Sequence, residues 1–83
     1  MRKAQDELVL RAAAAEIKAR RGRIDISQEE LAHRADVHRS FIARVEVAQT
    51  QPSLAVLVRI ADALEVDAAE LVRAIVERCK REA

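Results

Sequence analysis

The sequence predicts an all-α protein, a compact domain of five short helices, and three observations support this prediction. The 83 residues include a single glycine and a single proline, so few positions interrupt a helix. Apolar residues recur at intervals of three and four, and no segment alternates as a strand would. The composition is 51% hydrophobic but 1% aromatic, so Ala, Leu, Val and Ile must fill the core. We expect one domain, residues 1–83, too small to spare a deep enzyme cleft.

The first predicted helix covers residues 3–21. Leu10, Ala14 and Ile17 follow helical spacing, and no breaker precedes Gly22. We expect Gly22 to end this helix as its C-cap residue, because glycine readily adopts the left-handed conformation found there. Residues 23–26 then form a short connection.

A helix-turn-helix is predicted over residues 27–46. Ser27 and Glu30 form a capping box, which starts the second helix at a definite residue. A turn at 36–38 separates it from a third helix, 39–46. The inner faces of these two helices consist of Leu31, Ala32, Ala35, Ile42 and Val45. Such a unit presents one rigid helix to the major groove of DNA.

Two further helices are predicted in residues 53–81, which we expect to supply core and dimerisation surface. Pro52 and Ser53 introduce a helix whose apolar face contains Leu54, Leu57, Ile60, Ala61 and Leu64. Asp67 and Glu70 form a second capping box, which opens the last helix. Its inward side is expected to hold Leu71, Val72, Ile75 and Cys79.

The distribution of charge favours a DNA contact in the first half of the chain. The net charge is only +1, which argues against a polybasic, histone-like binder. Residues 1–44 hold ten Lys/Arg and seven Asp/Glu, whereas residues 45–83 hold five and seven. The basic excess therefore lies in the half of the chain that contains the helix-turn-helix, as a groove reader requires.

Other classes of protein find little support. Cys79, the one cysteine, cannot form an intrachain disulfide, and no signal peptide or membrane-spanning run is visible, so we expect a cytoplasmic protein with no membrane partner. His33 and His38 straddle a turn without further ligands at metal spacing, so no metal or other cofactor is expected. No catalytic arrangement and no small-molecule site presents itself. We therefore expect no enzyme.

Several spaced motifs resemble the Cro/repressor (XRE-type) helix-turn-helix family over about residues 14–75. They are Ser27-Gln-Glu-Glu-Leu-Ala, Ile42-x-x-x-Glu46, Pro52-Ser-Leu54 and Leu57-x-x-Ile-Ala-x-Ala-Leu-x-Val66. The resemblance implies a lambda-repressor-like domain that regulates transcription by binding a near-palindromic operator as a homodimer. The run His38-Arg39-Ser40 also resembles the start of the recognition helix in restriction–modification controller proteins.

The resemblance implies roles for individual residues. With helix 39–46 in the major groove, the implied DNA contacts are Gln28, His38, Arg39, Ser40, Ala43, Arg44 and Gln49. The chemistry agrees, because Arg bonds guanine in a bidentate manner and a helix N-terminus, where Gln28 lies, attracts phosphate. The family also implies that Glu46 pairs with a basic residue of the first helix, for which we expect Lys18, and so braces the recognition helix.

Departures from the family pattern keep an alternative open. Asp36 stands in the turn where glycine is usual, Glu65 stands where glycine commonly ends the fourth helix, and Ala48-Gln-Thr replaces a glycine followed by basic residues. The alternative is a helical protein-interaction module, antitoxin-like or regulatory, with weak or lost DNA binding. Whether a DNA-binding form activates or represses depends on where its operator lies.

A dimer interface is expected toward the C-terminal half. Val47, Val56 and Val76 have no evident internal contacts among the predicted helices. Two subunits joined there would hold their recognition helices about 34 Å apart, one turn of DNA, so the half-site centres would lie about 10 base pairs apart.

Overall fold

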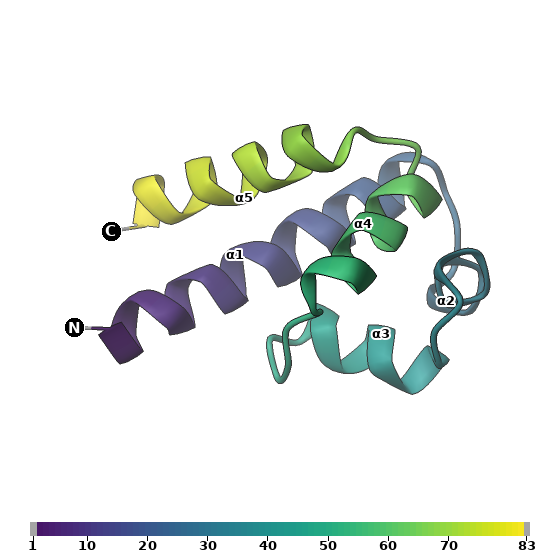
Figure 1. Ribbon diagram of the computed structural model, residues 1–83, viewed down its shortest axis with the longest axis horizontal. Helices are drawn as coiled ribbons and strands as arrows, with labels where there is room; N and C mark the ends of the chain where they lie inside the picture. The colour runs from purple at the N-terminus through teal and green to yellow at the C-terminus, as the bar shows by residue number, and fades with distance from the viewer. Residues whose placement is uncertain (1, 83) are drawn as a thin grey trace.

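The computed structural model describes residues 2–82 and confirms the all-α class. Its helices are α1 (Arg2–Arg23), α2 (Gln28–Ala35), α3 (Arg39–Glu46), α4 (Leu54–Ala63) and α5 (Ala68–Glu82). Helices α1 and α5 pack along each other in opposite directions, so both ends of the chain lie at one end of the molecule (Figure 1). Helices α2, α3 and α4 gather around the other half of α1. Within residues 2–82, no helix has the length and apolar content needed to cross a membrane.

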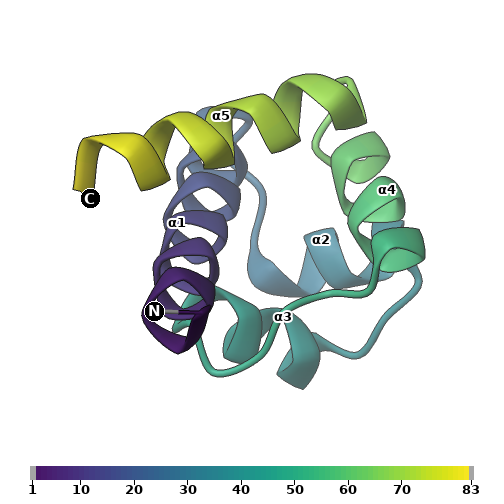
Figure 2. The same ribbon diagram turned by 60° about the vertical axis from the view of Figure 1, so that its left-hand side comes forward.

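The core has two parts that meet along α1. The larger cluster joins α1 to α2, α3 and α4 through fully or nearly buried side chains, among them Ile17, Leu31, Ala35, Ile42, Val45, Ile60 and Leu64. The smaller cluster joins α1 to α4 and α5 through Ala12, Ala13, Ala61, Leu71 and Ile75. Figure 2 shows α5 crossing over α1 above the helix-turn-helix. The inner faces predicted for α2 and α3 are confirmed.

Gly22 does not end α1, and that prediction was wrong. The helix continues through Gly22 to Arg23, and Asp25 adopts the left-handed conformation with φ 57°. The Asp25 N–H donates to the Gly22 carbonyl at 3.2 Å, and the Ile26 N–H donates to the Arg21 carbonyl at 3.3 Å. This pair of hydrogen bonds is a Schellman motif displaced by several residues from the expected site.

The next three helices end in the same way, without a glycine. Asp36, Ala48 and Glu65 have φ of 57°, 61° and 63°, and each follows the last turn of a helix. For example, the Asp36 N–H bonds to the His33 carbonyl at 3.2 Å and the Val37 N–H to the Ala32 carbonyl at 3.0 Å. A side chain in this conformation costs about 1–2 kcal/mol, which the family's usual glycine avoids. The turns form nonetheless, as the sequence predicted for Asp36.

Two arginines cap opposite helices and hold α2 against α4. The Nε of Arg59 on α4 donates to the Ala35 carbonyl at the end of α2 at 2.9 Å. In return, Nη1 of Arg34 on α2 donates to the Ala63 carbonyl at the end of α4 at 3.3 Å. Each guanidinium therefore satisfies a carbonyl at the end of the other helix, where the last carbonyls have no intrahelical partner.

Three apolar side chains lie elsewhere than expected. Leu54, the first residue of α4, is 75% exposed because it lies beyond the edge of the core. Val72 is 41% exposed, because α5 contacts α1 through Leu71 and Ile75 and the next residue points about 100° away. Val56, by contrast, was expected to lack internal contacts but is half-buried against the larger core cluster.

Candidate nucleic-acid interface

Helix α3 presents one polar face outward and is anchored by the other. Ile42 and Val45 are buried in the core, whereas Arg39, Ser40 and Arg44 are exposed on the opposite side. Ala43 lies between these polar residues and is half-buried. The helix is therefore held rigidly while its exposed face is left available to a partner.

The side chains at the start of α3 are not committed to capping the helix. His38 is the N-cap residue by its backbone, yet its ring makes no capping hydrogen bond. Its Nδ1 lies 3.5 Å from the Ser40 hydroxyl oxygen, so the two exposed side chains share one small polar cluster. Both can turn to an outside partner without uncapping the helix.

Phe41 orients one of the two exposed arginines. The Arg44 guanidinium lies 6.0 Å from the centre of the Phe41 ring, at the limit of a cation–π contact. Phe41 is itself half-buried against the larger core cluster. The position of Arg44 is thus linked to the core through the only aromatic residue of the chain.

Glu46 pairs with Arg21, and the prediction of Lys18 was wrong. The Glu46 carboxylate accepts from Arg21 Nε at 2.7 Å and Nη2 at 2.9 Å, while Arg21 Nη1 donates to the Ile26 carbonyl at 2.9 Å. Lys18 is exposed and forms no ion pair with Glu46 within residues 2–82. The expected link between α1 and the end of α3 is therefore present, made by the guanidinium whose fork matches a carboxylate bidentately.

Gln28 joins the ion pair of Arg21 and Glu46, and we call these three residues the brace. Its Nε2 donates to Glu46 Oε1 at 3.0 Å, which ties the first turn of α2 to the last turn of α3. An amide nitrogen carries two hydrogens, so one remains for another acceptor. The bond fixes the orientation of Gln28, a constraint that the sequence did not reveal.

The brace keeps Glu46 ionised although the carboxylate is buried. Burial alone would raise its pKa, but hydrogen bonds from Arg21 and Gln28, together with the positive charges of Arg21 and Lys18, lower the pKa below the ordinary 4.5. The same hydrogen bond raises the pKa of Arg21. The buried pair is thus a carboxylate and a guanidinium, and it is close to neutral as a whole.

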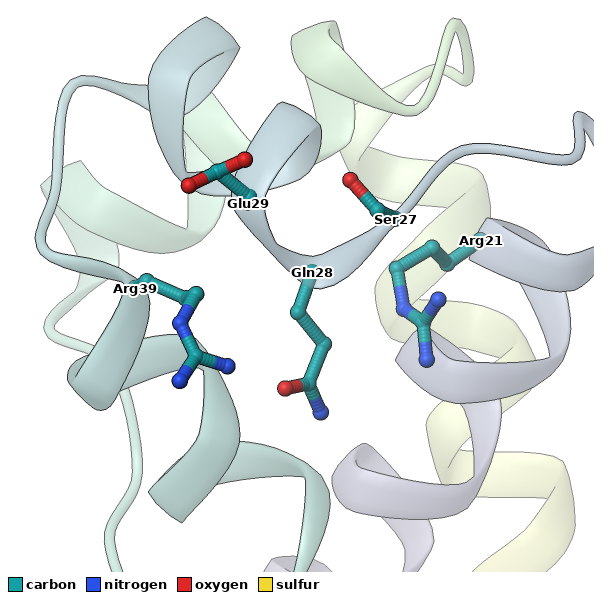
Figure 3. Close-up of a pocket in the computed structure, with 5 residues that line it drawn as sticks. All are labelled: Arg21, Ser27, Gln28, Glu29 and Arg39. Atoms are coloured by element: carbon teal, nitrogen blue, oxygen red, sulfur yellow. The ribbon is translucent and has the colours of Figure 1, made fainter.

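A shallow polar hollow of about 550 Å³ opens beside this brace. Its lining residues are Arg21, Ser27, Gln28, Glu29 and Arg39. Figure 3 shows Gln28 between Arg21 and Arg39, with the ends of all three side chains turned toward the same open space. Ser27 begins α2 by accepting from the Glu30 N–H at 3.0 Å, so the positive end of that helix also faces the hollow. Arg39, the Gln28 amide and this helix end can each contact an anionic oxygen, while the Glu29 carboxylate lines the same hollow.

Gln49, the last of the expected contact residues, lies at the opposite end of α3. Its side chain is exposed, and its N–H donates to the Arg44 carbonyl at 2.9 Å, so the backbone of the loop is fixed there. Along α3, His38, Arg39 and Ser40 therefore lie at the start, and Ala43, Arg44 and Gln49 follow toward the end. Gln28 comes from α2, bonds to the last turn of α3 through Glu46 and lines the hollow with Arg39.

Comparison with known families identifies the family to which this domain belongs. A family model described as helix-turn-helix matches residues 17–71, which include α2, α3 and the brace. The chain belongs to the XRE-type helix-turn-helix family. This places it among DNA-binding transcriptional regulators, in agreement with the prediction from its motifs.

Solved structures support this assignment. The restriction–modification controller protein C.AhdI from Aeromonas hydrophila is 31% identical, with a TM-score of 0.72 over 75% of this chain and 94% of that one. The clp gene regulator ClgR from Corynebacterium glutamicum has a TM-score of 0.83 at 18% identity, over 89% of this chain and 79% of that one. The second likeness shows the fold alone. A search of curated proteins finds no significant match.

Sequence reasoning about this XRE-type domain missed a buried carboxylate. Glu16 is 5% exposed and accepts from Arg20 at 2.6 Å and from Arg78 at 2.7 Å, so it joins α1 to α5. Burial would raise its pKa, but the two hydrogen bonds and both positive charges lower it. The spacing of Glu16 and Arg20 was a possible signal, since an acid and a base four residues apart share a helix face.

Proposed function

We propose that this protein is a sequence-specific transcription regulator that binds a near-palindromic operator as a homodimer, with α3 in the major groove. The observation that carries the proposal is the rigid display of α3. One of its faces is buried, its last turn is tied to α1 and α2 through Glu46, and its exposed face bears Arg39, Ser40 and Arg44. A groove reader needs such a helix, because bidentate contacts with base edges require fixed geometry.

The residues proposed to contact DNA divide into those that read bases and those that contact the sugar-phosphate backbone of the DNA. Arg39 and Arg44 would each bond to a guanine, Ser40 suits either partner of a base pair, and Ala43 leaves room for a thymine methyl group. Gln28, with its remaining amide hydrogen directed to the hollow, would bond to a phosphate. His38 and Gln49 would add backbone contacts at the two ends of α3.

The dimer follows from how little DNA one helix covers. A single recognition helix reads too few base pairs to single out one site, and two-fold symmetry doubles the reading. Val47 and Val76, two of the three valines expected at the interface, are 62% and 44% exposed, which supports a role in association. Val56 packs against the core and is left out of this proposal. Such a regulator would act in the cytoplasm, beside the DNA.

A second candidate is the protein-interaction module with weak or lost DNA binding. The loop after α3 favours it, because Ala48, Gln49 and Thr50 offer no positive charge to phosphates. The exposed cations of α3 favour the regulator, since Arg39 and Arg44 make no ion pair within the described residues.

Selection of binding sites from random duplex DNA separates the two candidates. The expected result is a near-palindrome whose half-site centres lie about 10 base pairs apart. Arg39→Ala should lose preference at one or two positions of each half-site. The matched control Arg81→Ala removes an exposed arginine from the far end of α5 and should leave the selected sequence unchanged. Binding with no sequence preference, or none at all, would favour the interaction module.

A further inference from the structure

Glu29 places a carboxylate within the surface that is proposed to face DNA. It is the second residue of α2 and is exposed. Its side chain lines the polar hollow and also a smaller hollow of about 280 Å³ beside it. Arg39, the first residue of α3, is the one other residue that lines both hollows. The starts of α2 and α3 therefore hold an anion and a cation as neighbours.

The domain itself uses neither of these two charges. The adjacent carboxylate of Glu30 accepts from Arg34 at 2.9 Å, whereas Glu29 and Arg39 form no ion pair within residues 2–82. Figure 3 shows the Glu29 carboxylate and the Arg39 guanidinium turned away from each other. The hydrogen-bonding capacity of both groups is therefore left for a partner.

The balance of charge around Arg39 argues against a simple phosphate contact. In the larger hollow the charge of Arg21 is already matched by Glu46, so Glu29 offsets the charge of Arg39. A carboxylate at this place repels phosphates, and so it opposes the electrostatic attraction on which binding to any DNA sequence depends. A cation beside an anion is suited instead to hydrogen bonds with the uncharged edge of a base.

We propose that Glu29 determines the sequence preference of this protein by positioning Arg39 on a guanine. A guanidinium has five N–H donors, and a bidentate contact with guanine uses two of them. The Glu29 carboxylate accepts one of the remaining N–H groups, and this charge-assisted hydrogen bond fixes the plane of the guanidinium against the base edge. Glu29 acts through Arg39 and is a positioning residue. The inference deepens the proposed function and rests on its assignment of Arg39 as a base reader.

A purely structural role for Glu29 has a different consequence. A carboxylate in the first turn of a helix stabilises that helix through its dipole. Loss of that stabilisation would lower the free energy of unfolding and weaken binding to every DNA sequence alike. Preference at a single base pair therefore separates the positioning role from the structural one.

Substitution of Glu29 in the full-length chain tests the proposal by site selection and by titration at fixed salt. Glu29→Gln keeps the shape of the side chain and removes its charge. It should lower the preference at the base pair read by Arg39 about tenfold, while the affinity for random-sequence duplex rises about two- to threefold because a repulsive charge is lost. Preferences at the other positions should not change. In an Arg39→Ala background, Glu29→Gln should cause no further loss of preference.

Two matched variants separate contact from charge. Glu29→Asp keeps the charge but shortens the side chain, so it should lower the preference at the same base pair while binding to random-sequence duplex stays at the wild-type level. Glu77→Gln removes an exposed carboxylate from α5 and should leave the selected sequence unchanged. Melting curves identify any variant that fails to fold.

The possible results distinguish this inference from the function on which it rests. Wild-type preference in Glu29→Gln overturns the positioning role, even with stronger binding to random-sequence duplex, because that combination is simple repulsion. Full preference in Glu29→Asp overturns it as well, since charge without reach would then suffice. An Arg39→Ala chain that keeps its preference, or a wild-type chain that has none, overturns the base-reading role of Arg39 and the inference together.

Discussion

Replacement of Glu46 by glutamine should destabilise the domain strongly and weaken operator binding without changing the preferred sequence. The Glu46 side chain is 2% exposed and its partner Arg21 is 18% exposed, so solvent screens the pair only weakly. Glutamine preserves the shape but has one acceptor oxygen where Arg21 and Gln28 together direct three hydrogen bonds at two oxygens. Arg21 would remain largely buried without a counter-charge.

The expected loss is about 2–3 kcal/mol, somewhat below the 3–5 kcal/mol typical when one partner of a buried pair is removed, because the amide oxygen still accepts one bond. For a domain of this size the loss lowers the melting temperature by roughly 10–20 °C. Thermal and urea unfolding, monitored by circular dichroism, measure the loss of unfolding free energy. Glu77→Gln, on the exposed side of α5, is the matched control and should shift stability by less than about 0.5 kcal/mol.

A double-mutant cycle tests the assignment to Arg21. Glu46→Gln and Arg21→Met should show a coupling free energy of about 2 kcal/mol, whereas Lys18→Met combined with Glu46→Gln should show at most a few tenths. Zero coupling with Arg21, or equal coupling with Lys18, would refute the argument that the bidentate contact braces α3.

Three further predictions follow from the same structure. The pKa values of Glu16 and Glu46 in the folded state are lowered from 4.5, so between those lowered values and pH 4.5 the unfolded chain binds more protons than the folded one. The stability that these two carboxylates contribute should therefore be complete above about pH 4.5 and fall as the pH drops through the folded-state pKa values. Urea unfolding as a function of pH measures this fall. Ala48→Gly should raise the free energy of unfolding by about 1 kcal/mol, because it relieves a left-handed backbone at φ 61°, and no gain in urea unfolding would show that the turn is unstrained. Arg39→Ala should lower operator affinity by about 1–3 kcal/mol, measured by titration at fixed salt, and an unchanged site preference would remove Arg39 from the base-reading residues.

The sequence by itself determined where α2, α4 and α5 begin and most of the residues that build the core. Helix starts depend on neighbouring residues, because a capping side chain bonds to an N–H two or three positions further on. Ser27, Ser53 and Asp67 all accept such bonds, at 3.0, 3.2 and 2.7 Å. The spacing of apolar residues also sufficed to identify the two helices of the helix-turn-helix, because apolar residues that recur every three or four positions share one face of a helix whatever its tertiary contacts.

Only the tertiary structure decided where α1 ends and which cation meets Glu46. Gly22 has the right chemistry for a helix end, but Ile24 and Ile26 pack against the core, and the chain reaches those positions by continuing α1 to Arg23. Lys18 and Arg21 are both cations one turn apart on α1, and sequence spacing cannot tell which of them faces a carboxylate far along the chain. That choice depends on the rotation of α1 about its own axis, which is set by the packing of Ile17 and its alanine neighbours against α2, α4 and α5.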